Sequence, residues 1–150
     1  MRVDQLMTSD PKCCTPDMSI QEAAQLMIAC DCGAIPVVES GDHTKPVGII
    51  TDRDIACRAV AEGKHPQQTK VSDCMTPSLA CVSPDTSLEE CCEIMEKNQL
   101  RRLLIADSQG GLRGIISQAD IALHAGRNKA AEVVKRVSQP TGKASAVSSA

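Results

Sequence analysis

Apolar residues recur along this 150-residue chain at two spacings, one helical and one typical of strands. Behind Ser19 they fall at i, i+3, i+4, i+7 and i+8, which predicts an amphipathic helix. The pattern Ser19-x-x-Glu22 is a capping box that begins this helix, and Gly33 is predicted to end it. The predicted core face consists of Ile20, Ala23, Ala24, Met27 and Ile28.

Strand patterns surround this helix. The continuous apolar runs 34–38 and 47–51 are typical of buried strands, and Pro36 requires a position without a ladder hydrogen bond from its nitrogen. Residues 12–15 are a further, shorter strand candidate, and 52–62 returns to helical spacing. The predicted order is therefore strand, helix, strand, strand, helix.

The whole pattern then occurs a second time. Met7-Thr8 reappears as Met75-Thr76, Ser19-x-x-Glu22 as Ser87-x-x-Glu90, and the stretch from Gly48 to Ile55 as the stretch from Gly114 to Ile121. Two copies form a pseudo-twofold pair rather than a solenoid. Cys91 and Cys92 stand where the first copy has Ala23 and Ala24, so we expect them to be small core residues.

The predicted fold class is α/β (α+β), with two β-α-β-β-α repeats packed pseudo-symmetrically as one unit. We place the first repeat at 3–66 and the second at 71–126, whose strands 103–106 and 112–117 are joined by a hairpin turn at 109–111. A further helix is predicted at 127–137. The Ser- and Ala-rich residues 138–150 are predicted to be a disordered tail.

Composition narrows the function classes. A net charge of −3 argues against a general nucleic-acid binder, and the absence of Phe, Tyr and Trp removes the usual stacking platform for bases. No apolar run is long enough to cross a bilayer, and the N-terminal residues lack the layout of a signal peptide. We therefore expect a cytoplasmic protein without a membrane or nucleic-acid partner.

The titratable residues offer no clear catalytic or metal constellation. Nine cysteines without an export signal favour reduced thiols. The single Cys30-x-Cys32 pair is a weak zinc signal, so no metal site is predicted. None of the three histidines has a nucleophile at a suggestive spacing, and we do not expect an enzyme.

The repeated Gly-Ile-Ile-[Thr/Ser]-x-x-Asp-Ile stretch admits two interpretations. Thr51 with Asp54, and Ser117 with Asp120, have the spacing of a helix N-cap and its N3 partner. Each pair also follows a buried strand at a helix start, where backbone N–H groups favour anions and a carboxylate can accept hydrogen bonds from ribose hydroxyls. The interpretations are compatible, because an anion site needs a well-formed helix start.

Residues 3–125 resemble a tandem pair of CBS domains, the Bateman module. The resemblance is carried by the Met-Thr starts, the Pro-Asp-x-Ser helix entries, Gly33–Val38 and the repeated stretch. The helix that follows Thr51 and the closing helix look similar to those of small stand-alone bacterial CBS-pair proteins, including hypoxia- and stress-response members. The resemblance implies a regulatory sensor whose two clefts bind adenosine ligands such as AMP, ADP, ATP, NAD or S-adenosylmethionine. It also implies a homodimer arranged as a disc of four CBS units, with output to another protein or to its own assembly.

The resemblance further implies which residues share each cleft. One cleft is expected to combine Ser117, Asp120, Arg101 and Arg102 with Thr8, Cys13, Cys32 and Gly33. The other is expected to combine Thr51, Arg53, Asp54, Gly33 and Ala34 with Thr76, Cys81, Leu100 and Arg101.

The second copy departs from the family pattern. Leu104 replaces a proline, and Gln118-Ala119 replaces Asp52-Arg53, so the first copy has the fuller motif. Arg101 and Arg102 are expected to compensate, unless they are only a solvated pair. Two alternatives stay open: a ligand-free structural or redox-responsive interaction module that uses its cysteines, and, less favoured, a nucleotide-processing enzyme.

Overall fold

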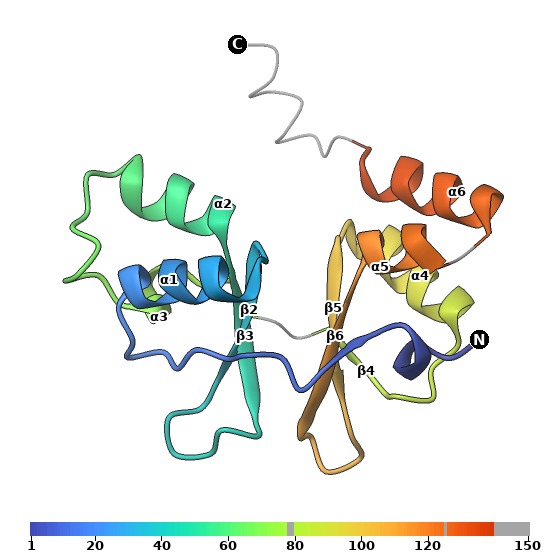
Figure 1. The fold of residues 1–150 in the computed structure, drawn as a ribbon, viewed down its shortest axis with the longest axis horizontal. Helices are drawn as coiled ribbons and strands as arrows, with labels where there is room; N and C mark the ends of the chain where they lie inside the picture. Colours follow the sequence, from blue (N-terminus) through green and yellow to red (C-terminus); the bar gives the residue numbers. More distant parts are fainter. Residues whose placement is uncertain (78–79, 125, 140–150) are drawn as a thin grey trace.

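The structure of the protein is a computed structural model that describes residues 1–77, 80–124 and 126–139. It has two lobes, each with strands toward the centre of the molecule and helices outside (Figure 1). The first lobe contains α1 (Ile20–Cys30), β2 (Ala34–Val38), β3 (Pro46–Thr51) and α2 (Asp52–Ile55), which continues as a π-helical segment, η2 (Ala56–Val60), and α3 (Val71–Cys74).

The second lobe repeats this order and adds a helix. It contains β4 (Cys81–Val82), α4 (Leu88–Asn98), β5 (Arg102–Ala106), β6 (Leu112–Ser117), α5 (Gln118–His124) and α6 (Arg127–Val137). It also receives the N-terminal η1 (Val3–Gln5) and β1 (Thr8–Ser9). The predicted α/β class with two repeats is confirmed.

Each repeat lends its first segment to the other lobe. The strand order in the larger sheet is β1-β6-β5-β4, so Thr8 pairs with Ile115 of the second repeat. Reciprocally, Thr76 pairs with Ile49, beside the two-stranded β2-β3 sheet. Figure 1 shows the blue N-terminal segment starting beside the yellow and orange elements before it crosses to the first lobe. The exchange follows the pseudo-twofold relation between the repeats.

The core is split in the same way. One cluster of buried aliphatic and sulfur-containing side chains fills the second lobe and includes Val3, while the other fills the first lobe and includes Val71. The Val3 amide donates to the Thr86 carbonyl at 2.9 Å, and the equivalent Val71 amide donates to Met18 at 2.8 Å. The first residues of each repeat are therefore part of the other repeat's core.

The glycines that open the repeated stretch permit this exchange. A Cβ at Gly48 would lie 2.6 Å from the Thr76 carbonyl oxygen, and one at Gly114 would lie 2.8 Å from that of Thr8. Both contacts are shorter than real Cβ atoms make, so only glycine lets the exchanged segment approach the strand.

Most predicted helices and strands of the two repeats are confirmed. Ser19 caps α1 in a reciprocal capping box, and Cys91 and Cys92 are buried in the core, with 0% and 6% exposure. The hairpin turn at 109–111 is also confirmed, with Gly110 at a φ of 82°. These features rest on local periodicity and turn chemistry, which the sequence displays directly.

The predicted strand at 12–15 is wrong. Only Cys14 bridges Val37, donating to the Pro36 carbonyl and accepting from Val38. The ladder cannot extend in either direction because Pro36 and Pro16 lack an N–H. The strand that the first segment does form is β1, which the sequence pattern did not indicate.

The predicted end of the first helix is also wrong. α1 ends at Cys30, and Asp31 takes the left-handed cap position with φ 50°, where Gly33 was expected. Aspartate tolerates this conformation better than most residues. Ile28, which the spacing assigned to the core face, is 83% exposed. The helix expected over 52–62 ends at Val60. Of the tail predicted at 138–150, residues 140–150 lie outside the described residues.

Candidate functional site

The two hydroxyl–carboxylate pairs are helix caps. The Asp54 amide donates to Thr51 Oγ1 at 3.0 Å, and the Thr51 amide donates to Asp54 Oδ2 at 3.0 Å. In the second copy the Asp120 amide donates to Ser117 Oγ at 3.2 Å, and Asp120 Oδ2 accepts from the Ser117 amide at 2.7 Å. The cap interpretation is therefore confirmed at both places, and each cap holds its carboxylate at the end of a strand.

The first expected cleft draws residues from both repeats. Thr8 in β1 lies beside Ile115, shortly before Ser117, and Arg102 is the cross-strand neighbour of Ser117. The Arg101 carbonyl accepts a hydrogen bond from Gln118 at 2.9 Å, while its side chain is exposed. The structure thus brings Thr8, Arg102 and the Ser117–Asp120 cap together where β6 ends and β5 begins.

Cys32 is an expected member of this cleft that comes from the first lobe. Burial raises the pKa of its thiol, whereas a hydrogen bond with the backbone of Ala34 and the positive charge of Arg102 act against that rise. The charge of Arg102, which belongs to the other repeat, is the smallest of these influences. Cys13 is half-buried and donates to the Pro11 carbonyl at 3.2 Å, which is a local contact only.

The second expected cleft is organised around Asp54. Ala34 pairs with Thr51, and the Asp52 amide donates to the Gly33 carbonyl at 2.9 Å. From the second repeat, Thr76 Oγ1 donates to Asp54 Oδ1 at 3.4 Å. These residues are brought together as the resemblance implied, and the exchanged segment that carries Thr76 makes the contact.

Arg58 is a member of this second group that the sequence analysis did not predict. Its Nε lies 3.9 Å from Asp54 Oδ1, and Nη1 donates to the Met75 carbonyl at 3.0 Å and the Cys74 carbonyl at 3.3 Å. The i,i+4 spacing from Asp54 is a signal that could have indicated the ion pair. The carbonyl contacts depend on the exchanged segment and had no sequence signal.

Other expected members lie elsewhere. Cys81 lines a depression of about 540 Å³ together with Lys45 and Pro46, at the opposite end of β3 from Thr51. A strand of this length separates its ends by roughly 17 Å. Leu100 packs against the core of the second lobe, and Arg53 is exposed.

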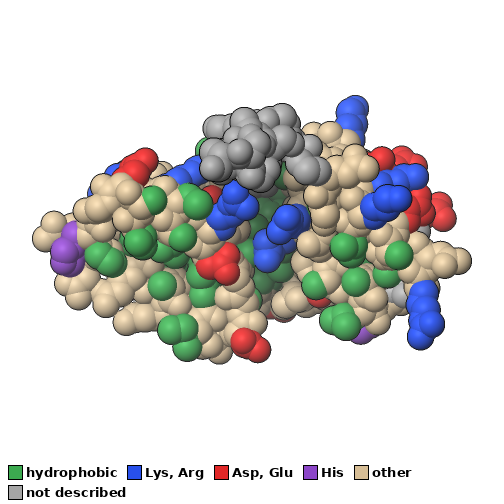
Figure 2. Space-filling model, turned by 90° about the horizontal axis from the view of Figure 1, so that it is seen from above, with side chains coloured by type: hydrophobic (Ala, Val, Ile, Leu, Met, Phe, Trp, Pro, Cys, Tyr) green, Lys and Arg blue, Asp and Glu red, His purple; other side chains and the backbone are tan. Residues whose placement is uncertain are grey.

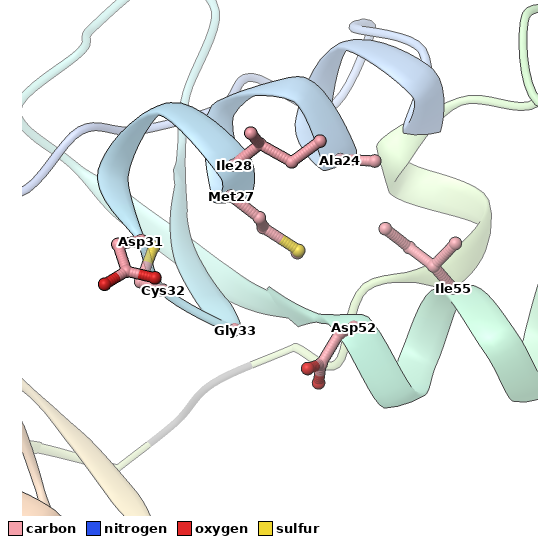
Figure 3. Close-up of a pocket in the computed structure, with 8 residues that line it drawn as sticks. All are labelled: Ala24, Met27, Ile28, Asp31, Cys32, Gly33, Asp52 and Ile55. Carbon is pink, nitrogen blue, oxygen red and sulfur yellow. The ribbon is translucent and has the colours of Figure 1, made fainter.

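An open depression of about 680 Å³ separates α1 from α2 in the first lobe (Figure 3). Met27 and Ile55 point into the space between the helices, and Asp31, Cys32 and Asp52 stand at one end. The lining residues are Ala24, Met27, Ile28, Asp31, Cys32, Gly33, Asp52 and Ile55. Only Cys32 and Gly33 belong to the expected cleft residues. In the view from above, hydrophobic side chains line a hollow between the lobes, and basic side chains stand beside it (Figure 2).

The comparison with known families decides the identity of this fold. The model of the CBS domain matches residues 3–59 and again residues 71–126. The chain belongs to the CBS domain family. The resemblance inferred from the repeated motifs is therefore confirmed, and the small CBS pair has relatives of similar size.

Among these relatives is the CBS domain-containing protein YhcV of Bacillus subtilis, which is 42% identical over 129 residues, 86% of this chain and 89% of YhcV. The solved CBS domain pair of protein MJ0100, in complex with 5′-methylthioadenosine and S-adenosyl-L-methionine, matches with a TM-score of 0.74 and 27% identity. That match covers 84% of this chain and 100% of the MJ0100 chain.

A third relative carries a metal. Hypoxic response protein 1 of Mycobacterium tuberculosis is 31% identical over 140 residues, 93% of this chain and 96% of the relative. The solved structure of Hypoxic Response Protein I, with two coordinated zinc ions, has a TM-score of 0.73 and 28% identity over 84% of this chain and all of that one. In the described part of this CBS pair, no three His, Cys, Asp or Glu side chains are grouped to hold a metal. No described helix is long and apolar enough to cross a membrane.

Proposed function

We propose that this CBS pair is a regulatory module that binds an adenosine-containing small molecule between its lobes. The observation that carries the proposal is the convergence of Thr8, Arg102 and the Ser117–Asp120 cap, from two repeats, at the end of β6 where α5 begins. A guanidinium suits a phosphate or carboxylate group of a ligand, and a carboxylate suits the vicinal hydroxyls of ribose. The complex of the related MJ0100 pair with two adenosine compounds supports the same ligand class.

The carboxylates of Asp54 and Asp120 differ in whether their Oδ1 atom already has a partner. Asp54 Oδ2 accepts from Thr51, and its Oδ1 accepts from Thr76 and lies near Arg58. Asp120 Oδ2 accepts from Ser117 twice, at 2.7 Å and 2.9 Å, and within the described residues its Oδ1 has no partner. A ribose hydroxyl would share Oδ1 with Thr76 and Arg58 at Asp54, whereas at Asp120 it would be the first partner of Oδ1 among the described residues.

We therefore assign the primary ligand cleft to Asp120 rather than Asp54. This reverses the ranking that the motifs favoured, in which the Thr51 copy was the fuller one. The cationic contact that Gln118-Ala119 lacks comes from Arg102, with Arg101 beside it. The set proposed for this cleft is Thr8, Cys32, Arg101, Arg102, Ser117 and Asp120.

Ligand binding where β6 ends would act directly on the relative arrangement of the two lobes. Thr8 belongs to the first repeat but pairs with β6 immediately before the Ser117 cap. A ligand held by Asp120, Arg102 and Cys32 would contact both lobes and favour one relative arrangement of them. A ligand shifts such an equilibrium only by its difference in affinity for the two arrangements.

The redox-responsive alternative is less well supported. A responsive thiol needs a lowered pKa and access to solvent. Burial instead raises the pKa of each shifted thiol, to about 11 for Cys14 and about 12 for Cys91. The same direction holds for Cys13, Cys32, Cys74 and Cys81. We favour sensing over a thiol response, and over catalysis, for which no constellation was predicted.

The test is a thermal-unfolding panel with AMP, ADP, ATP, NAD, S-adenosylmethionine and 5′-methylthioadenosine. A bound ligand at about 100 times its Kd adds about 2.7 kcal/mol to the free energy of unfolding, which raises Tm by roughly 5–11 °C. An added dye or calorimetry must report unfolding, because the chain lacks Trp and Tyr. If no compound changes Tm, the proposed ligand class is wrong.

Matched variants separate the two clefts. Asp120→Asn keeps the shape of the side chain but removes its charge, and we expect it to abolish the ligand-induced rise in Tm. Asp54→Asn is the control that should keep most of that rise. Loss of binding in Asp54→Asn alone would overturn the assignment to Asp120 without refuting the ligand class.

A further inference from the structure

The carboxylate of Asp54 forms an ion pair within its own helix. Arg58 Nε lies 3.9 Å from Asp54 Oδ1, one helical turn further along the chain, and the Asp54 side chain is only 13% exposed. The hydroxyl of Thr76 donates to the same oxygen at 3.4 Å. A carboxylate oxygen has about two acceptor sites, so Arg58 and Thr76 together take up the capacity of Oδ1.

A second set of contacts holds Arg58 in this place. Its Nη1 donates to the carbonyl of Met75 at 3.0 Å and to that of Cys74 at 3.3 Å. Both carbonyls lie at the C-terminal end of α3, where carbonyl groups lack helical partners and a positive charge is favourable. Arg58 therefore bridges the carboxylate of Asp54 and the exchanged segment.

The second repeat has an equivalent position without the equivalent contacts. Position 58 of the first copy corresponds to position 124 of the second, which is His124, an exposed residue at the end of α5. Within the described residues His124 forms no ion pair with Asp120. The hydroxyl of Thr8, the counterpart of the threonine that bonds the first carboxylate, does not donate to Asp120 either. The Asp120 side chain accepts from Ser117 alone.

We propose that Arg58 keeps ligand out of the Asp54 cleft, and that the residue four positions after each aspartate decides which cleft binds, a role that rests on the proposed adenosine binding. Arginine carries a permanent positive charge, which at this position pairs with the carboxylate that a ribose would need. Histidine is shorter and carries no permanent charge, so His124 leaves the Asp120 carboxylate to the ligand.

The Asp54 cleft otherwise has the groups that a ligand of this class requires. The Thr51–Asp54 cap forms with both amide–oxygen distances at 3.0 Å, and Arg53 beside it is exposed and can pair with an anionic group. Without Arg58, Thr76 would remain as the one described partner of Asp54 Oδ1. The first cleft should therefore become a binding site when Arg58 is replaced.

The test counts bound molecules per full-length chain by titration calorimetry at neutral pH, with AMP, ATP and S-adenosylmethionine as separate probes. Wild-type protein should bind one molecule of at least one probe. Arg58→His, which installs the residue of the second copy, should bind two, a gain that a merely structural role of Arg58 would not produce. His124→Arg should weaken the wild-type site at least about tenfold, because a charged group then competes for the Asp120 carboxylate.

Arg113→His is the matched control. Arg113 is exposed on β6, and within the described residues its side chain forms no hydrogen bond or ion pair, so this variant should still bind one molecule. If the wild type binds two molecules, or if Arg58→His binds one as the wild type does, this role of Arg58 is refuted while the proposed function stands. Unchanged affinity in His124→Arg refutes it too, even where Arg58→His does not fold.

Two further outcomes separate the role of Arg58 from the proposed function. Binding by Arg58→His but not by the wild type would support the role of Arg58 and overturn the assignment of the primary cleft to Asp120. If none of the probes binds to any of these proteins, the proposed function and the role of Arg58 are both wrong.

Discussion

Replacing Gly48 by alanine should destabilise the protein, although Gly→Ala in a strand usually has the opposite effect. Alanine normally stabilises by about 0.4–1 kcal/mol because it restricts the unfolded chain. At Gly48, however, the new Cβ would lie 2.6 Å from the Thr76 carbonyl oxygen and 3.3 Å from the Pro77 Cα. These are backbone atoms, so no side chain can rotate away, and the exchanged segment itself must move.

The expected magnitude follows from overpacking, which typically lowers the free energy of unfolding by about 1–3 kcal/mol. For a chain of this size that corresponds to a fall in Tm of roughly 2–12 °C. The movement would also strain the hydrogen bond between Ile49 and Thr76 and the contact of Thr76 with Asp54.

Thermal unfolding of Gly48→Ala is compared with that of Gly41→Ala. A Cβ at Gly41 meets no atom within 4 Å, so this control should be neutral or slightly stabilising. If Gly48→Ala has the Tm of the wild type or a higher one, the exchanged segment does not approach β3 as closely as the structure shows. The explanation for the glycine in the repeated stretch would then fail.

Three further predictions concern caps, thiols and pH. Ser87→Ala should lower the free energy of unfolding by about 1 kcal/mol, because Ser87 Oγ accepts from the Glu90 amide; an unchanged Tm would contradict this. In native protein at pH 8, Cys91 should resist a thiol reagent that labels the exposed Cys57, since burial raises the pKa of Cys91 to about 12; mass spectrometry of labelled peptides decides. A hydrogen bond from the Ser83 hydroxyl lowers the pKa of Asp85, so the ionised Asp85 contributes to stability above its unfolded pKa, and this contribution is lost as the pH falls through the folded pKa. Asp85→Asn should therefore reduce the acid-induced fall in Tm, and a profile of Tm against pH equal to that of the wild type would refute this prediction.

Much of the fold was predictable because its signals are local. Helix caps such as Ser19 and Ser87, the strands 34–38 and 112–117, and the core cysteines of α4 depend on residues close together in the sequence. The failed predictions show the limit of such signals. The strand at 12–15 is stopped by Pro16 and Pro36, and the latter lies on a strand that sequence spacing alone does not place beside Cys14.

The candidate site divides in the same manner. Its motif residues were identified from the duplication, and both caps formed as their spacing predicted. Arg58 was missed, and Cys81 was expected beside Asp54 but lines another depression. The Asp54 carboxylate is occupied by Arg58, which the i,i+4 spacing supplies, and by Thr76, which meets Asp54 only because the exchanged segment returns to the first lobe.

The sequence by itself determined that this protein is a duplicated CBS pair, with capped helices, aliphatic strands and two equivalent hydroxyl–carboxylate pairs. Periodicity, capping and repetition encode these features within short stretches. The tertiary structure alone decided how the equivalent copies become unequal. Thr76 donates a hydrogen bond to Asp54. Ile121 is fully buried in the lobe that α6 covers, whereas Ile55 lines an open depression. Those differences arise from contacts between segments distant in the chain, whose geometry no local pattern records.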